Sequence, residues 1–184
     1  MRVISGSARG RILEPVPGKD TRPTTDKVKE SVFNILQFRL YDAAMLDLFA
    51  GTGQMGIEAL SRGAARAVFV DRAPKAISII RKNVAAARVE DRAEVLQMTY
   101  QQALQKLQGQ KFDILFLDPP YGGELLNSAL NAVESFDILS ADGIIICESS
   151  VEDTVMCPDT FSVYRTYQYG TIRLTALCRK EENE

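Results

Sequence analysis

The sequence predicts an α/β protein built on one doubly wound, mostly parallel sheet. Short apolar runs alternate with helical patterns from residue 44 onward, and the runs are too uniformly apolar to have one face in water. The last two runs instead alternate in character on either side of Gly170, which predicts an antiparallel pair. A chain of 184 residues, 46% apolar and 25% charged, has the size and balance of one soluble domain.

The predicted elements follow in order along the chain. Parallel strands are expected at residues 45–49, 67–70, 93–96, 113–117 and 144–148. Helices are expected between them at residues 56–62, 74–86, 100–107 and 124–136. The pair at residues 161–167 and 172–178 completes a seven-stranded sheet with an antiparallel last strand.

The N-terminal region differs in composition from the rest. Residues 1–23 hold six glycines and prolines among β-branched residues, which favours a small β-hairpin or extended arm rather than a core layer. Residues 24–36 repeat apolar side chains at helical spacing, with Thr24 or Thr25 placed to cap the helix. We therefore divide the chain into an arm, residues 1–23, and an α/β domain, residues 24–184.

Charge is distributed unevenly along the chain, although its net value is only −2. Residues 1–40 hold eight basic and four acidic side chains, so this segment is +4 and the remainder is −6. A basic arm on an acidic body is suited to local contact with phosphate groups, and a solvated surface segment is the alternative.

Composition also excludes several classes of site. Histidine, the commonest metal ligand and general base, is absent from the sequence. The cysteines Cys147, Cys157 and Cys178 are scattered and odd in number, so we expect no disulfide framework, no metal site and a reducing, cytoplasmic location. No apolar run approaches the ~20 residues that a membrane span needs, and the N-terminus lacks the apolar stretch of a secretory signal.

A glycine-rich loop follows the first predicted strand. Gly51, Gly53 and Gly56 let the backbone approach a ligand and present N–H groups at the start of a helix. Asp71 ends the second strand twenty residues after Gly51, where an acidic side chain can bind ribose hydroxyls. This pattern predicts a nucleotide-type ligand, and a tight glycine-rich turn is the alternative.

Asp47 helps to choose between a dinucleotide such as NAD and S-adenosylmethionine. It lies inside an apolar strand, four residues before Gly51. A dinucleotide brings an anionic pyrophosphate to this loop, whereas S-adenosylmethionine brings an ammonium and a sulfonium group. A carboxylate is favourable beside the cationic ligand. A buried acid that caps loop N–H groups is the other interpretation of Asp47.

The run D-P-P-Y, Asp118 to Tyr121, ends the fourth predicted strand next to the first. Acceptors aimed at the hydrogens of an exocyclic amine would favour a pyramidal nitrogen with its lone pair free. Asp118 supplies a carboxylate, Pro119 a carbonyl, and Pro119 and Pro120 fix φ. Tyr121 offers a π-face for a planar base, worth ~1–3 kcal/mol. The alternative is a rigid turn with a packed tyrosine. Glu148 ends the fifth strand at the same edge.

The motif D-L-F-A-G-T-G, residues 47–53, resembles the first motif of the class I S-adenosylmethionine-dependent methyltransferases, and Asp71 matches their ribose-binding acid. The resemblance implies a Rossmann-like methyltransferase sheet and S-adenosylmethionine as cofactor. Met98 or Thr99 occupies the place beside the adenine, where that family commonly has a polar or acidic side chain. The implied cofactor-binding residues are Asp47, Phe49, Ala50, Gly51, Thr52, Gly53, Asp71, Arg72, Met98 and Thr99.

D-P-P-Y resembles the signature of amino-group methyltransferases. The motifs G-x-x-R-G-R-x-L (6–13), R-P-T-x-D (22–26) and V-K-E-S-V-F-N (28–34) resemble the bacterial 16S rRNA guanine-N2 methyltransferases. The resemblance implies methylation of a guanine in 16S rRNA, presented by the small ribosomal subunit or its assembly intermediate. It implies RNA contacts at Arg9, Arg11, Arg22, Thr24 and Lys29. A loop or single-stranded guanine would cost least to flip.

Other functions fit part of the sequence. The signature also serves adenine N6 and protein glutamine, so another amine acceptor stays open. An NAD-dependent oxidoreductase would use the glycine loop, but no Tyr-x-x-x-Lys pair or histidine supplies a proton. A non-catalytic RNA-binding relative is disfavoured because Asp47 and Asp118 are both present. We expect a monomer.

Overall fold

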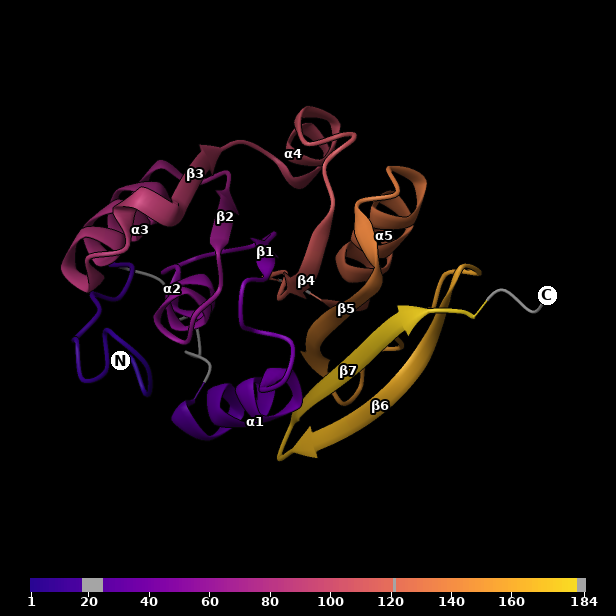
Figure 1. Ribbon diagram of the computed structural model, residues 1–184. Coiled ribbons are helices and arrows are strands. Elements are labelled where there is room, and N and C mark those ends of the chain that lie inside the picture. Colours follow the sequence, from indigo (N-terminus) through magenta and orange to yellow (C-terminus); the bar gives the residue numbers. More distant parts are fainter. Residues whose placement is uncertain (18–24, 121, 182–184) are drawn as a thin grey trace.

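The computed structural model describes residues 1–17, 25–120 and 122–181 (Figure 1). Its sheet has seven strands in the order β3-β2-β1-β4-β5-β7-β6. Pairs among the first five are parallel, and β7 runs antiparallel to both neighbours, β5 and β6. The strands are β1 (Ala44–Asp47), β2 (Arg66–Asp71), β3 (Ala93–Gln97), β4 (Phe112–Leu117), β5 (Leu139–Ser150), β6 (Phe161–Tyr169) and β7 (Ile172–Arg179). The predicted doubly wound α/β sheet with an antiparallel last strand is confirmed.

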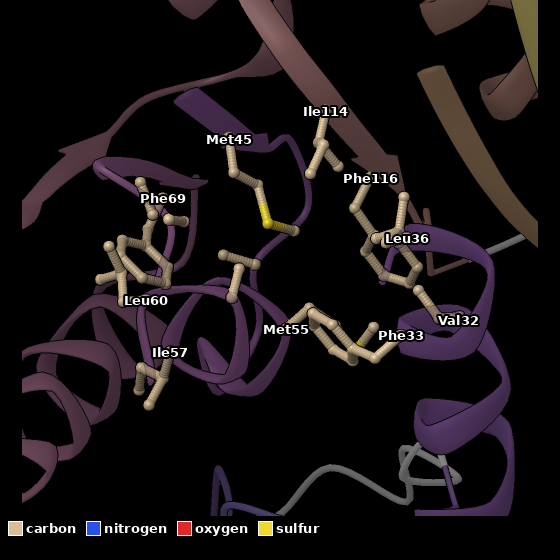
Figure 2. Close-up of a cluster of buried hydrophobic side chains, with 14 of the residues drawn as sticks. Val32, Phe33, Leu36, Met45, Met55, Ile57, Leu60, Phe69, Ile114 and Phe116 are labelled. Carbon is tan, nitrogen blue, oxygen red and sulfur yellow. The ribbon is translucent and has the colours of Figure 1, made fainter. Parts of the chain in front are cut away.

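The helices cover both faces of the sheet. On one face lie α1 (Asp26–Leu36), α2 (Gln54–Ser61) and α3 (Pro74–Ala87), and on the other α4 (Tyr100–Lys106) and α5 (Gly122–Ser135). Figure 2 shows Met45, Ile114 and Phe116 of the sheet among side chains of α1 and α2. The intervening strand residues, such as Leu115 and Leu117, pack on the opposite face. Burial on both faces explains why the parallel strands are so uniformly apolar.

Helix starts follow local sequence signals. Thr25 caps α1, since its hydroxyl accepts a hydrogen bond from Val28 N–H at 3.3 Å. Helix α2 begins two residues before the predicted start, after the left-handed Gly53. Gly56 lies inside α2, and a Cβ there would come within 2.3 Å of the Phe69 ring. This glycine therefore permits close packing of α2 on β2.

Strand β5 is longer than its apolar run, residues 144–148. It starts at Leu139, which pairs with Phe112 of β4, and a register shift in β4 follows. The Ser140 hydroxyl donates to Asp113 Oδ1 at 2.9 Å. The first part of β5 is partly exposed and polar, so hydrophobic periodicity alone does not indicate a strand there.

The N-terminal arm forms a hairpin that packs against α2. Arg2 and Ile12 form an antiparallel bridge. Contrary to expectation, the arm contributes to the core through its buried side chains Val3, Ala8 and Leu13. Gly6 has φ of 84°, and a Cβ there would lie 1.8 Å from the Ser61 carbonyl oxygen. The predicted boundary between arm and domain lies outside the described residues and stays a prediction.

Candidate active site

The candidate active site lies at the carboxyl ends of the parallel strands. Strand β1 lies between β2 and β4, so the loop after β1 leaves the sheet where the strand order reverses. Asp47 ends β1, Asp71 ends β2, and Asp118 directly follows β4. Parallel pairing therefore brings the three predicted acids to one edge of the sheet.

Residues 48–53 form the loop between β1 and α2. Gly51 and Gly53 have φ of 55° and 77°, in the left-handed region that favours glycine. The Gly51 N–H donates to Asp71 Oδ2 at 3.0 Å, and the Ala73 N–H donates to Asp71 Oδ1 at 2.8 Å. These bonds hold the Asp71 carboxylate against the loop while leaving lone pairs that can accept from ligand hydroxyls.

The Asp47 carboxylate is buried and lacks a hydrogen-bond partner among the described residues. It is 1% exposed, and neither of its oxygens accepts a hydrogen bond of ordinary geometry from the described residues. Burial raises the pKa of Asp47 to about 7; the Gly56 N–H lies near enough to oppose this rise, and the charge of Asp71 adds to it. Burying such a carboxylate without a partner lowers the folding stability of the free protein, and a cationic ligand group beside it would stabilise its charge.

Asp118 lies in a strongly acidic environment. Burial raises the pKa of Asp118 well above its usual range, and the charges of Glu148 and then Asp47 raise it further. The residue as a whole is only partly buried, so a ligand can approach it. Pro119 and Pro120 follow directly. Tyr121 lies outside the described residues, and its stacking role stays a prediction.

Apolar and aromatic groups gather beside the end of β3. The rings of Phe49 and Tyr100 lie 5.6 Å apart between centroids, and Met98 packs against the same core. The Thr99 hydroxyl accepts from the Gln102 N–H at 3.3 Å and so caps α4. Tyr100 is absent from the predicted set, because the sequence marks it only as a helix start.

Three other predicted cofactor residues lie in the loops that follow β1 and β2. Ala50 is buried, and Arg72 is exposed just beyond β2. Thr52 lies within the loop after β1, and its carbonyl accepts a hydrogen bond from Asn83 Nδ2 of α3 at 2.9 Å. Their roles as cofactor contacts stay predictions.

Asn83 of α3 connects the loop with the arm. Its Nδ2 group also donates to the Glu14 carbonyl at 3.0 Å, and its Oδ1 accepts from the Glu14 N–H at 2.7 Å. The side chain is 1% exposed. Nothing in the sequence points to this role, because an asparagine within a helix has no local signature.

Lys29 conflicts with the prediction of a phosphate contact. Its side chain is fully buried, donates to the Arg2 carbonyl at 2.5 Å and forms an ion pair with Glu58 at 3.6 Å. Burial lowers the pKa of Lys29, although the Glu58 carboxylate opposes the effect. Glu58 also accepts from the N–H groups of Ile4 and Ser5 at 2.8 and 2.9 Å. Lys29 therefore anchors the arm and has no surface to offer RNA.

The remaining predicted RNA contacts divide into two groups. Arg9 and Arg11 are exposed on the arm. Arg22 and Thr24 lie outside the described residues.

Other kinds of site have little support. The described residues contain no group of three or more acidic or cysteine side chains placed to hold a metal ion. Cys147 is buried on β5 in the core under α4 and α5, and burial raises the pKa of its thiol, so it is no ready nucleophile. Within the part of the chain that the structure describes, every helix is too short or too polar to cross a membrane.

Comparison with known proteins adds independent information. The family model described as Conserved hypothetical protein 95 matches residues 1–178. The chain is 43% identical over 162 residues to YlbH of Bacillus subtilis (strain 168), a candidate rRNA methyltransferase, with 87% of each chain covered. It is 35% identical over 186 residues to ribosomal RNA small subunit methyltransferase D of Escherichia coli (strain K12), covering 100% of this chain and 92% of the relative.

Solved structures resemble the whole fold. The candidate methyltransferase yhhF from Escherichia coli superposes with a TM-score of 0.87 at 34% identity, covering 98% of both chains. An RNA methyltransferase from Salinibacter ruber, solved with S-adenosyl-L-homocysteine, gives a TM-score of 0.67 at 19% identity, covering 88% of this chain and 97% of that one. The second likeness concerns the fold alone.

Proposed function

The chain belongs to the Conserved hypothetical protein 95 family and is related over its whole length to a ribosomal RNA small subunit methyltransferase D, and from this premise we propose its reaction. The reaction is methyl transfer from S-adenosylmethionine to the exocyclic N2 amine of a guanine in 16S rRNA. The observation that carries the proposal is the pair of acids at the ends of β1 and β4, the unpartnered Asp47 and the Asp118 whose pKa is raised. Asp47 would face the cationic end of the ligand, and Asp118 would face the amine.

The residues at the carboxyl edge fit S-adenosylmethionine. Asp47, buried and without a hydrogen-bond partner of ordinary geometry, suits the positive end of the ligand. Asp71, already oriented by the Gly51 and Ala73 N–H groups, suits the ribose hydroxyls. The apolar surface around Phe49 and Met98 suits the adenine. When bound, this cofactor supplies an electrophilic methyl group on a sulfonium.

Asp118 and Pro119 would prepare the amine for attack. The Asp118 carboxylate and the Pro119 carbonyl would accept the two N2 hydrogens, which favours a pyramidal nitrogen whose lone pair is less delocalised into the ring. The nitrogen gains positive charge as the new bond forms, and a neighbouring carboxylate stabilises it. The raised pKa of Asp118 also makes it a stronger proton acceptor than an ordinary aspartate. Tyr121 would stack on the base.

The proposed partner is 16S rRNA in the small ribosomal subunit or its assembly intermediate. Arg9, Arg11, Arg22 and Thr24 are the proposed backbone contacts, which would set position rather than read sequence. A flipped loop or single-stranded guanine is the proposed substrate. A monomer acting in the cytoplasm, where subunits assemble, completes the proposal.

Labelled S-adenosylmethionine tests the proposal when it is incubated with small-subunit particles, naked DNA and a release-factor protein in parallel. We expect label in the particles, recovered as N2-methylguanosine after nuclease digestion and mass spectrometry. Label in DNA or in protein glutamine would instead support the other amine acceptors. Calorimetry with NAD distinguishes the oxidoreductase, because the protein should bind S-adenosylmethionine and not NAD.

A further inference from the structure

Three carboxylates stand in a row along the carboxyl edge, one from each of three adjacent strands. In the sheet, β4 lies between β1 and β5. Leu117 pairs with Cys147, so Asp118 and Glu148, one residue later in each chain segment, lie at the same level. Asp47 pairs with Phe116 and therefore lies two residues before that level. Asp118 therefore lies between Asp47 and Glu148 along the row.

The alternation of side chains along a strand puts all three on the same face. Met45, Phe116 and Ile146 pack in the core under α1, α2 and α3, and Figure 2 shows the first two. Asp47 and Glu148 follow Met45 and Ile146 by two positions in their strands, and positions two apart share a face. Asp118 follows Phe116 by two positions, directly after the end of β4, and continues the same alternation. The charges of Glu148 and Asp47 both raise the pKa of Asp118, which agrees with this order.

The row has a cofactor end and a substrate end. Asp47 precedes the glycine loop, which places it at the cofactor end. Glu148 lies across Asp118 from that loop, and it is buried to 8% exposure although it is charged.

We infer that Glu148 accepts a hydrogen bond from the N1–H of the substrate guanine while Asp118 accepts from its N2 amine. The inference rests on the proposed function and adds how the base is chosen. N1–H and N2–H₂ are neighbouring donors on the Watson–Crick edge of guanine, so two adjacent carboxylates match them. Adenine presents an acceptor at N1, and its lone pair would face the Glu148 carboxylate without a proton between them. Glu148 is thus a specificity-determining residue.

The test replaces the target guanine by 2-aminopurine, which keeps the N2 amine but has an unprotonated N1 and no O6. The change in preference caused by Glu148→Gln therefore reports on N1, since O6 is lost equally for both proteins. Small subunits reconstituted with either base at the methylated position are assayed for kcat/KM. A site that reads N1–H should favour guanine over 2-aminopurine by at least ~10-fold to 100-fold, because the carboxylate would otherwise meet an acceptor. Glu148→Gln should lose ~10-fold or more on guanine and reduce this preference to about threefold or reverse it, since its amide can donate to N1.

Matched variants separate base reading from structural damage. Glu152→Gln changes an exposed carboxylate just after β5 and should leave the preference for guanine as in the wild type. Glu148→Asp keeps the charge on a shorter side chain and should retain the preference at a lower rate. The melting temperature and the affinity for S-adenosylmethionine show whether each variant is folded.

Failure of the inference about Glu148 can be distinguished from failure of the proposed function. If the wild-type protein methylates the guanine and 2-aminopurine subunits equally well, or if Glu148→Gln keeps the full guanine preference, the role of Glu148 is refuted and the proposed function stands. If the wild-type protein methylates no guanine in small subunits, the proposed function is refuted and the inference with it.

Discussion

Asp47→Asn should make the free protein more stable at alkaline pH while weakening its cofactor binding. Burial raises the pKa of this carboxyl group from 3.8 to about 7. One pKa unit corresponds to about 1.36 kcal/mol, so keeping Asp47 ionised costs the free chain about 4 kcal/mol of unfolding free energy at pH 8. Because the folded pKa is raised, stability is highest below about pH 4 and is lost as the pH rises to about 7.

Asparagine has nearly the same shape and carries no charge. Its amide is still buried without a partner, which costs about 1–3 kcal/mol, so the net gain at pH 8 is about 1–3 kcal/mol. The advantage should shrink by about 2–3 kcal/mol between pH 8 and pH 5, where folded Asp47 is protonated. Urea unfolding of both proteins at several pH values measures this difference. Asp142→Asn, at an exposed position of β5, is the matched control and should follow the wild type.

Cofactor binding should change in the opposite direction. The wild-type affinity for S-adenosylmethionine should rise with pH up to about 7, because the carboxylate must lose its proton to face a cation. The variant should bind ~10-fold to 100-fold more weakly and lack this dependence. If the difference in unfolding free energy between the wild type and Asp47→Asn is the same at pH 5 and at pH 8, the reasoning is refuted.

Three further predictions follow from the site and the core. Asp118→Ala should abolish turnover and leave the calorimetric affinity for S-adenosylmethionine nearly unchanged; a fully active variant would contradict the mechanism. Gly56→Ala should lower the unfolding free energy by about 1–3 kcal/mol, because its Cβ would lie 2.3 Å from the Phe69 ring, and chemical denaturation measures the loss. Replacing Arg9 and Arg11 together by alanine should raise KM for small subunits and flatten its salt dependence at unchanged kcat; an unaltered salt dependence would exclude them as phosphate contacts.

Local signals predicted the sheet and part of the site. Buried parallel strands are nearly continuous apolar runs, so β1 to β4 were predicted within two residues of their ends. A glycine-rich loop and acidic residues at strand ends can be recognised in the sequence. The topology of a parallel sheet brings those strand ends to one edge, so their proximity can be predicted as well. Asp47 and Asp118 could therefore be placed at one edge of the sheet from the sequence alone, and the parallel pairing of β1 with β4 agrees.

Long-range contacts could not be predicted in this way. Lys29 looks like a solvent-exposed lysine on an amphipathic helix, and only its ion pair with Glu58, on another helix, makes its burial tolerable. The polar start of β5 is a strand because Leu139 pairs with Phe112 of β4. Such features depend on partners distant in the sequence.

Asn83 has a consequence for the exchange of parts between related enzymes. One amide holds Glu14 of the arm and Thr52 of the cofactor loop, while Glu58 secures the beginning of the arm. The arm is therefore not a detachable module. A chimera that transplants it onto another methyltransferase would also have to carry α1, α2 and α3, since Lys29, Glu58 and Asn83, which hold the arm, lie on those helices.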